Sequence, residues 1–308
     1  MASDPGRATM GLLDGRVAIV TGAGRGLGRA HALTLAQAGA AVVVNDYGAG
    51  VGGEPDGESP AASVVDEICA AGGVAVADAS SVADWAACGR LVELAVDKFG
   101  RLDAVVNNAG IARDHMMTSS TEQDFDATIA VHLKGTFAMC HHASRYWRDL
   151  AKSGEVVSGR LVNTTSGAAM FGNIGQTAYA SAKAGIIAIT QTLAMEMQRY
   201  AVTVNAISPV ALTRMTKDLM TSVPDGGFDP LDPANASGLV AYLASAESGW
   251  LTGQVFRIEG NRIVRMREWS PVADYASRSG AAVTADELVT GMAHLYGVAP
   301  RGVTTVSR

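Results

Sequence analysis

Thr21-Gly22-Ala23-Gly24-Arg25-Gly26-Leu27-Gly28 is the stretch of sequence that decides the fold, and it follows an apolar run at residues 17–20. Glycines at such positions let a strand turn sharply into a helix whose first N–H groups face an anion. The spacing is TGxxxGxG. It is not GxGxxG, because position 27 is Leu27. No Gly-Lys-Ser/Thr follows, which disfavours a phosphoryl-transfer loop. A plain tight turn is the alternative, but the location at the first strand–helix junction favours a nucleotide site.

Outward from this turn, short β-branched runs alternate with helix-length segments. The runs predicted as strands are 17–20, 41–44, 74–77, 104–106, 161–164, 202–207 and 255–258. The predicted helices are 28–38, 61–71, 82–98, 124–150, 179–200 and 233–244. The first six runs are mostly apolar throughout, as in strands buried on both faces of a parallel sheet. This order predicts an α/β fold with a Rossmann-type, doubly wound, parallel seven-stranded sheet in a single domain.

Three segments depart from the alternation. Residues 1–13 are rich in small and polar residues and are predicted to be a disordered lead-in to a domain at 14–260. Residues 47–60 are a glycine-rich insertion after the second strand. Residues 261–308 form a C-terminal extension, in which Thr284-Ala285-Asp286-Glu287 is a capping-box pattern that predicts a helix to about His294. The extension could pack on its own domain or on a partner subunit.

Composition narrows the class of protein. The net charge of −6 disfavours nucleic-acid binding, which requires an excess of basic residues. No apolar run approaches the length of a membrane span. The scattered Cys69, Cys88 and Cys140 are typical of reduced thiols in an intracellular protein. No metal site is expected, because the adjacent His141 and His142 lack further ligands at suitable spacing. With no signal-peptide pattern, a soluble cytoplasmic protein is expected.

Polar residues at the ends of the second and fourth strands bear on the nucleotide. Asp46 ends the second strand, where a carboxylate can bind a ribose 2′-hydroxyl and repel a 2′-phosphate. Arg25 instead favours NADP, because a basic side chain in the glycine turn can reach such a phosphate. We weigh Asp46 more heavily and expect NAD, with NADP less favoured. Asn107-Asn108-Ala109-Gly110 closes the fourth strand and can bond backbone or cofactor, or simply form a turn.

Tyr179 and Lys183 are four residues apart, and Ser166 precedes them by thirteen positions. On a helix, positions i and i+4 share a face. A nearby ammonium favours the ionised phenol, so we expect Lys183 to lower the pKa of Tyr179 toward neutrality. The phenol could then exchange a proton with a substrate oxygen that a serine hydroxyl holds. An exposed Tyr and Lys on an ordinary amphipathic helix is the alternative for the pair alone.

Taken together, these motifs resemble the classical short-chain dehydrogenase/reductase family over residues 14–260. The resemblance implies that Tyr179 is the acid/base, that Lys183 lowers its pKa and holds the nicotinamide ribose, and that Ser166 orients the substrate. The implied cofactor-binding residues are Gly22, Arg25, Gly26, Leu27, Gly28, Asp46, Asn107, Asn108, Ala109, Gly110, Pro209 and Thr213, with Tyr179 and Lys183. Asp78 or Ser80 and Ser81 would meet the adenine. Val210 replaces the glycine that the family has after this proline.

One departure narrows the resemblance to a branch. Where the family has a fourth catalytic residue, an asparagine, this chain has His132, in His132-Leu133-Lys134-Gly135-Thr136-Phe137. A neutral imidazole could carry a proton relay, or it could only pack. This stretch, the insertion, and the segments 109–114, 171–176 and 213–216 are similar to the (3R)-hydroxyacyl-CoA dehydrogenase unit of peroxisomal multifunctional enzyme type 2, also called 17β-hydroxysteroid dehydrogenase type 4.

The resemblance implies an NAD(P)-dependent oxidoreductase that interconverts a secondary alcohol and a ketone. A (3R)-hydroxyacyl-CoA, with a fatty or steroid side chain, is the favoured substrate. The alternatives are a hydroxysteroid or general alcohol dehydrogenase without CoA, and a silent nucleotide-binding protein. Residues that could line an apolar mouth, or only pack in the core, are Ala168, Met170, Phe171, Ile111, Met116, Met117 and Met215.

Two further features concern partners. Arg262, Arg265 and Arg267 could meet CoA phosphates or could form a solvated face. Family members are usually dimers or tetramers built on two long helices, here 124–150 and 179–200. A homodimer or homotetramer is therefore expected.

Overall fold

The computed structural model describes residues 11–54, 57, 59–214, 227–267, 271, 273–277 and 283–296. Most of the predicted lead-in lies outside the described residues, as does Met215 of the predicted mouth. The chain divides into two compact units, residues 1–266 and 267–308.

The first unit is built on one eight-stranded sheet in the order β3-β2-β1-β4-β5-β6-β7-β8. The strands are β1 (Val17–Thr21), β2 (Ala41–Asn45), β3 (Val74–Asp78), β4 (Ala104–Asn107), β5 (Arg160–Thr164), β6 (Thr203–Val210), β7 (Val255–Glu259) and β8 (Arg262–Met266). The first seven are parallel, which confirms the predicted doubly wound sheet. β3 is more exposed than its apolar sequence predicts, because it lies at an edge of the sheet.

The eighth strand was not predicted, and it lies in the segment assigned to the extension. β8 pairs with β7 in antiparallel register, with Glu259 opposite Arg262. Gly260 and Asn261 join the two strands, and Gly260 has a φ of +56°. Gly-Asn between two apolar runs is a hairpin signal, so the sequence did contain the evidence for this strand. Arg262 and Arg265 are exposed on this edge strand, where charge discourages pairing with another sheet.

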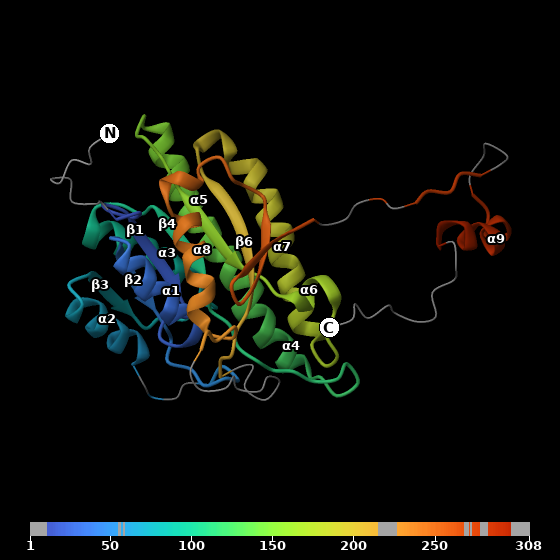
Figure 1. Ribbon diagram of the computed structural model, residues 1–308, viewed down its shortest axis with the longest axis horizontal. Helices are drawn as coiled ribbons and strands as arrows, with labels where there is room; N and C mark the ends of the chain where they lie inside the picture. The colour runs from blue at the N-terminus through green and yellow to red at the C-terminus, as the bar shows by residue number, and fades with distance from the viewer. Residues whose placement is uncertain are drawn as a thin grey trace. The chain divides into compact units, whose positions relative to one another are not determined.

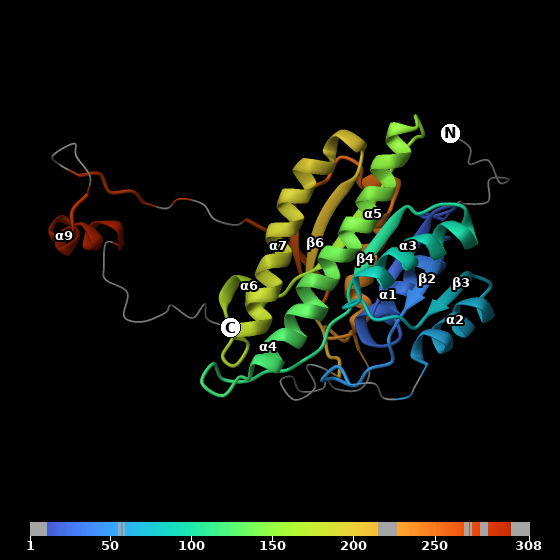
Figure 2. The ribbon, with the colours of Figure 1, turned by 180° about the vertical axis from the view of Figure 1, so that it is seen from behind.

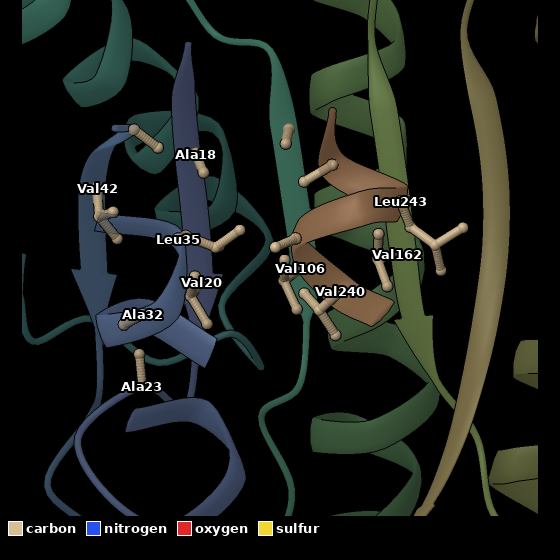
Figure 3. Packing of buried hydrophobic residues seen from close by; sticks show 14 of the residues in the cluster. Ala18, Val20, Ala23, Ala32, Leu35, Val42, Val106, Val162, Val240 and Leu243 are labelled. Carbon is tan, nitrogen blue, oxygen red and sulfur yellow. The ribbon is translucent and has the colours of Figure 1, made fainter. Parts of the chain in front are cut away.

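Helices cover both faces of the sheet. α1 (Gly26–Gln37), α2 (Pro60–Ala70) and α8 (Ser237–Ala244) pack on one face (Figure 1). α3 (Trp85–Phe99), α5 (Gly135–Lys152) and α7 (Thr177–Met197) pack on the other (Figure 2). Figure 3 shows Leu35 of α1 and Val240 of α8 over strand residues such as Val20 and Val106. Burying apolar side chains on both faces is what stabilises a parallel sheet.

The helix predicted at 124–150 is not continuous, and this prediction was wrong. α4 (Glu122–Thr128) begins at a capping box made by Thr121 and Asp124. It passes into a π-helical segment, η1 (Ile129–Lys134), before α5 starts at Gly135. A π turn holds an additional residue per turn and is frequent at functional sites. Here it contains His132, whose side chain is buried.

Shorter helices complete the first unit. They are α6 (Gly167–Phe171) and the 3₁₀ segments η2 (Gln198–Tyr200), η3 (Pro233–Ala236) and η4 (Ala246–Ser248). The first four residues of the helix predicted at 233–244 are the 3₁₀ segment η3. Among the described helices, none is both long and apolar enough to cross a membrane.

The second unit contains α9 (Ala285–Tyr296), which starts where the capping-box pattern predicts. The Thr284 hydroxyl accepts a bond from the Glu287 amide at 3.3 Å, and the Glu287 carboxylate accepts one from the Thr284 amide at 3.0 Å. Both bonds of the predicted box are therefore present.

Candidate active site

The glycine turn joins β1 to the N-terminus of α1, and its backbone leaves no space for side chains. A Cβ on Gly28 would lie 2.0 Å from the Gly22 carbonyl oxygen, and one on Gly22 would lie 2.7 Å from Ala109. Gly22 and Gly26 both have positive φ, at +61° and +51°. No side-chain cap bond is made by Arg25 at the N-cap position of α1. Backbone amides at this helix end can therefore face an anion, as the sequence predicts.

Asn108 braces the turn from the end of β4. Its amide nitrogen donates to the carbonyl oxygens of Thr21 at 3.1 Å and Gly22 at 3.0 Å. The Thr21 hydroxyl in turn accepts bonds from the backbone amides of Asn108 and Ala109. Two neighbouring strand ends are thus fixed to each other, so the turn is held in one shape. Thr21 had no role in the predicted set beyond its place in the motif.

Asn107 does not reach the site, contrary to its predicted cofactor-binding role. Its side chain is buried, donates to Asn163 at 2.9 Å and lies 3.4 Å from the sulfur of Cys140. Asn163 passes the chain of bonds on to Thr190 of α7. These polar groups link β4, β5 and α7 inside the molecule, so Asn107 supports the fold rather than the cofactor.

Asp46 follows β2 and lines the cavity, as predicted. One carboxylate oxygen accepts from the Gly24 amide at 2.8 Å and the other from the Gly48 amide at 2.9 Å. The carboxylate therefore lies directly against the glycine turn. The Arg25 guanidinium also lines the cavity, and it donates to the carbonyl oxygen of Ala49 at 3.1 Å.

Of the two options for the adenine contact, the structure places only the serines at the cavity. Asp78 is not a lining residue. Its Oδ1 accepts bonds from the Ser80 amide and hydroxyl and from the Asn45 side chain. Asp78 therefore shapes the loop after β3, while Ser80 and Ser81 line the cavity.

These elements enclose a cavity of about 410 Å³ along the carboxyl ends of the strands. From the predicted cofactor set it is lined by Gly22, Arg25, Gly26, Leu27, Gly28, Asp46, Ser80, Ser81, Asn108, Ala109, Gly110, Tyr179, Lys183 and Thr213. Pro209 is absent from this lining and pairs with Ile258 within the sheet. Sequence reasoning missed residues 49–53, Val82, Arg113 and Thr164, which also line it.

Tyr179 and Lys183 project from the same face of α7 into this cavity. The Lys183 ammonium lies 5.6 Å from the centre of the Tyr179 ring. It is buried and donates to the Thr164 carbonyl oxygen at 2.8 Å. Burial lowers the pKa of Lys183 to about 7.

The expected effect of Lys183 on the phenol is not found, and this prediction was wrong. Burial raises the pKa of Tyr179, a hydrogen bond with Ser166 lowers it only in part, and the charge of Asp114 raises it further. Desolvation disfavours the phenolate more than the neighbouring groups favour it. Because the pKa of Lys183 is itself about 7, its positive charge is only partly present at neutral pH.

Ser166 lies beside Tyr179, as predicted, at the start of α6. Its hydroxyl is hydrogen-bonded to Tyr179 and also accepts a bond from the Ala168 amide at 3.2 Å, which caps α6. The three residues of the predicted triad therefore meet at one place, although they come from two separate segments.

His132 lies next to the triad. Its ring is edge-on to the Tyr179 ring, with centres 5.1 Å apart. Its Nε2 lies 3.1 Å from the Ile111 nitrogen and 2.9 Å from the Ile111 carbonyl oxygen. Gly110 makes space for it, since a Cβ there would be 2.5 Å from the ring. Burial, and then the charge of Lys183, lower the pKa of His132 to about 3, so the ring is neutral.

An exposed apolar rim lies beside the start of α7. Gln176, just before α7, donates to the Asp114 carboxylate at 2.6 Å, so the loops after β4 and α6 are joined. The exposed apolar residues of these loops and of the end of α6 are Met116, Met117, Phe171 and Ile174. Three of them belong to the predicted mouth. Ile111 is buried and also lines the cavity.

Comparisons with known proteins agree with this geometry. The family profile described as short chain dehydrogenase matches residues 16–223. Hydroxyacyl-CoA dehydrogenase ChsB1 of Mycobacterium tuberculosis is 46% identical over 82% of this chain and 79% of its own length. Peroxisomal multifunctional enzyme type 2 of Drosophila melanogaster is 44% identical over 75% of this chain, which spans only 36% of that longer protein.

Solved structures give the same result. A short chain dehydrogenase from Mycobacterium avium superimposes with a TM-score of 0.84 at 50% identity, covering 96% of this chain and 100% of that one. The full-length Drosophila melanogaster enzyme superimposes with a TM-score of 0.72 at 33% identity, covering 92% of this chain and 45% of that one. The chain therefore belongs to the short-chain dehydrogenase family, whose enzymes are oxidoreductases that act on CH–OH groups.

Proposed function

We propose that this protein is an NAD-dependent (3R)-hydroxyacyl-CoA dehydrogenase. The observation that carries the proposal is that Tyr179 and Lys183 line a cavity whose other end is the glycine turn, with Ser166 hydrogen-bonded to Tyr179. The similarity to proteins named as hydroxyacyl-CoA dehydrogenase and peroxisomal multifunctional enzyme type 2 supports the substrate class.

The residues present fit a nicotinamide dinucleotide. Gly22, Gly26 and Gly28 keep the turn free of side chains, so the backbone amides at the start of α1 can donate hydrogen bonds to a pyrophosphate. Asp46 and the serines after β3 would hold the adenosine, and Tyr179 and Lys183 would hold the nicotinamide ribose. Such a cofactor, when bound, supplies the hydride acceptor.

The chain's own residues handle the substrate proton. Tyr179 as phenolate takes the hydroxyl proton of the alcohol, and as phenol it returns a proton to the ketone oxygen. Ser166 holds the same oxygen through its hydroxyl. Because burial raises the pKa of Tyr179, alcohol oxidation should speed up as the pH rises, and ketone reduction should not need high pH. The role of His132 in a proton relay stays a prediction. Its neutral ring also packs edge-on against Tyr179 and forms part of the cavity wall there.

The preference for NAD over NADP rests on Asp46. Its carboxylate would face a 2′-phosphate with a like charge in the same part of the cavity. Titrating each cofactor into the protein tests this, with NAD expected to bind at least about tenfold more tightly, which corresponds to about 1.4 kcal/mol. An Asp46→Ala variant should narrow the difference. Tighter binding of NADP by the unaltered protein would contradict the preference.

Turnover on matched substrates tests the substrate class. A (3R)-3-hydroxyacyl-CoA should be oxidised with NAD far faster than a free hydroxysteroid or a simple secondary alcohol. The exposed rim of Met116, Met117, Phe171 and Ile174 offers an adaptable apolar surface for an acyl or steroid group. Faster oxidation of the free steroid would favour the alternative function, and NAD binding without turnover on any alcohol would favour a silent protein.

The oligomeric state of the protein and its cellular compartment stay predictions, each supported by exposed or buried side chains. Phe137 of α5 and Met195 of α7 are more than half exposed, which is costly for large apolar side chains unless a second subunit covers them. We therefore propose a homodimer or homotetramer built on α5 and α7. Sedimentation at assay concentration should show no monomer. A cytoplasmic location is proposed on the free thiols of Cys88 and Cys140.

A further inference from the structure

The glycine-rich insertion after β2 forms one wall of the cavity. Residues 49–53, called here the insertion wall, all line it. They begin three residues after Asp46, whose carboxylate accepts a bond from the intervening Gly48 amide. The wall therefore adjoins the part of the cavity assigned above to the adenosine half of the cofactor.

The insertion wall has few contacts of its own to hold its shape. A short turn joins the Gly50 amide to the Glu54 carbonyl oxygen at 2.7 Å. Gly53 has a φ of +96°, and Gly52 next to it likewise has no side chain. Glycine loses more conformational freedom on ordering than any other residue, so such a segment needs outside contacts to stay in place.

The Ala49 carbonyl oxygen at the start of the wall accepts bonds from Arg25 and Arg214. Arg113, in the loop after β4, supplies the contacts to the rest of the insertion. Its Nε donates to the Gly52 carbonyl oxygen at 2.7 Å, and its Nη2 donates to the Glu54 carboxylate at 2.5 Å. The neighbouring Ala112 amide donates to the Val51 carbonyl oxygen at 2.8 Å. The Arg113 side chain is only 17% exposed. One planar guanidinium thus bonds both the backbone and a side chain of the insertion.

The other side of Arg113 is fixed to the catalytic part of the molecule. Its Nη1 donates to Asp124 at 3.3 Å, and Asp124 is held by the capping box with Thr121 at the start of α4. α4 leads into the π segment that carries His132, and His132 contacts Ile111 in the same loop as Arg113. Arg113 therefore connects the insertion wall to α4 and, through it, to the π segment that carries His132.

We propose that Arg113 is a positioning residue that sets the affinity for the adenosine half of the dinucleotide by holding the insertion wall in place. The proposal rests on the proposed function for the cofactor. Arg113 acts on the wall and takes no part in the proton transfer, so its loss should weaken cofactor binding and spare the chemical step.

Two substitutions and a matched control test this. Arg113→Met keeps a long side chain but removes its hydrogen-bond donors. Arg113→Lys keeps the positive charge but loses the planar set of guanidinium donors that reaches several acceptors at once. Arg90→Met is the control, because Arg90 also pairs with a carboxylate, Asp84, but is 61% exposed on α3. Calorimetric titration would give the dissociation constants of NAD and of ADP, which carries the adenosine and the pyrophosphate without the nicotinamide ribose. Steady-state rates at saturating NAD would give kcat.

Arg113→Met should raise the dissociation constants of NAD and ADP by a similar factor, about tenfold, with kcat unchanged within about twofold. Arg113→Lys should fall between it and the unaltered protein, and Arg90→Met should match the unaltered protein. If Arg113→Met unfolds, Glu54→Ala replaces it, because Glu54 is 76% exposed and contributes one of the three contacts. That variant should weaken NAD binding by about twofold to threefold.

Unchanged affinities in both the Arg113→Met and Glu54→Ala variants would overturn the proposal. So would a fall in kcat with the NAD affinity kept, because that pattern would place Arg113 in the chemical step. If the unaltered protein bound no NAD, the proposed function itself would fail, and this result is distinct from either of the others.

Discussion

Both ends of the parallel sheet carry buried charged side chains, but the two ends use them differently. At the amino end, Asp103 accepts bonds from the Val17 amide at 2.9 Å and from both sides of the Arg101 guanidinium. Arg160 donates to the carbonyl oxygens of Ser245 and Gly159, each at 2.8 Å. These charges bond strand starts and loops to each other, so this end stabilises the fold.

At the carboxyl end the charged and polar groups line the cavity and do not bond strand starts to loops. Lys183 donates to one carbonyl oxygen, and the pKa of its buried ammonium is lowered to about 7. In the part of the chain that the structure describes, the Nδ1 of His132 and the hydroxyl of Thr164 have no hydrogen-bond partner, and both residues line the cavity. Among the same described residues, the Nε of Arg16 and the hydroxyl of Thr203, at the amino end, also have none, but neither residue lines the cavity. Burying polar groups in this way costs stability. The comparison indicates that this end is arranged for ligands, at the expense of stability.

The largest effect that tests this contrast is expected at Lys183. Lys183→Met should lower turnover by about 10²–10³-fold and yet raise the free energy of unfolding at pH 7 by about 1–2 kcal/mol. The pKa of this group is about 7 in the folded protein and 10.5 ordinarily, so the unfolded chain binds more protons between these values and stability rises with pH there. Methionine removes that cost.

Initial rates and denaturant unfolding of the same preparation would check both halves of this result. A Lys183→Met protein that lost stability along with turnover would show that Lys183 supports the fold, and the contrast between the two ends would break.

The opposite result is expected at Asp103. Asp103→Ala leaves Arg101 and the Val17 amide without their partner, so it should cost about 3 kcal/mol of stability. NAD affinity of the folded protein should not change, because Asp103 lies at the other end of the strands from the cavity. Urea unfolding and NAD titration would measure the two quantities. A weaker NAD affinity with little loss of stability would contradict this assignment.

Acid pH should reveal the buried histidines. Burial lowers the pKa of His31 on α1 to about 4 and that of His132 to about 3. The unfolded chain therefore binds more protons below about pH 6.5, and stability should fall from there to about pH 4 by about 3 kcal/mol per ring. His132→Asn should make this slope shallower in unfolding experiments. An unchanged slope would mean that His132 is not buried as a neutral ring.

A smaller effect is expected at Asp114, whose charge raises the pKa of Tyr179. Asp114→Asn removes the charge but keeps an oxygen that can accept the bond from Gln176. The pKa of Tyr179 should therefore fall, and the rise of the alcohol-oxidation rate should move to lower pH. The pH dependence of kcat would show this. A shift to higher pH would mean that Tyr179 does not set the profile.

The sequence predicted what depends on local pattern. Continuous apolar runs located seven strands, and the glycine spacing and the Tyr179–Lys183 interval identified both ends of the cavity. What it missed depends on contacts between distant segments. Asn107, and Asp78 as one of the two options for the adenine contact, do not line the cavity, because their partners lie on neighbouring strands and loops. The pKa of Tyr179 was misjudged because burial outweighs a charge that sequence spacing alone suggests.

The π segment and the Arg113 contacts show the same limit. An amphipathic pattern continues through residues 124–150, and nothing in it marks the widened turn at η1. The partners of Arg113 in the insertion, Glu54 and Gly52, lie 59 and 61 positions earlier in the chain. No local sequence pattern relates residues that far apart.

The central claim is that the carboxyl end holds a proton-handling site centred on Tyr179. The most direct test compares the unaltered protein with Tyr179→Phe, using NAD and a (3R)-3-hydroxyacyl-CoA. The account predicts NADH formation by the unaltered protein, a loss of at least about 10³-fold in Tyr179→Phe, and equal NAD affinity in both. Comparable NADH formation by Tyr179→Phe would contradict it.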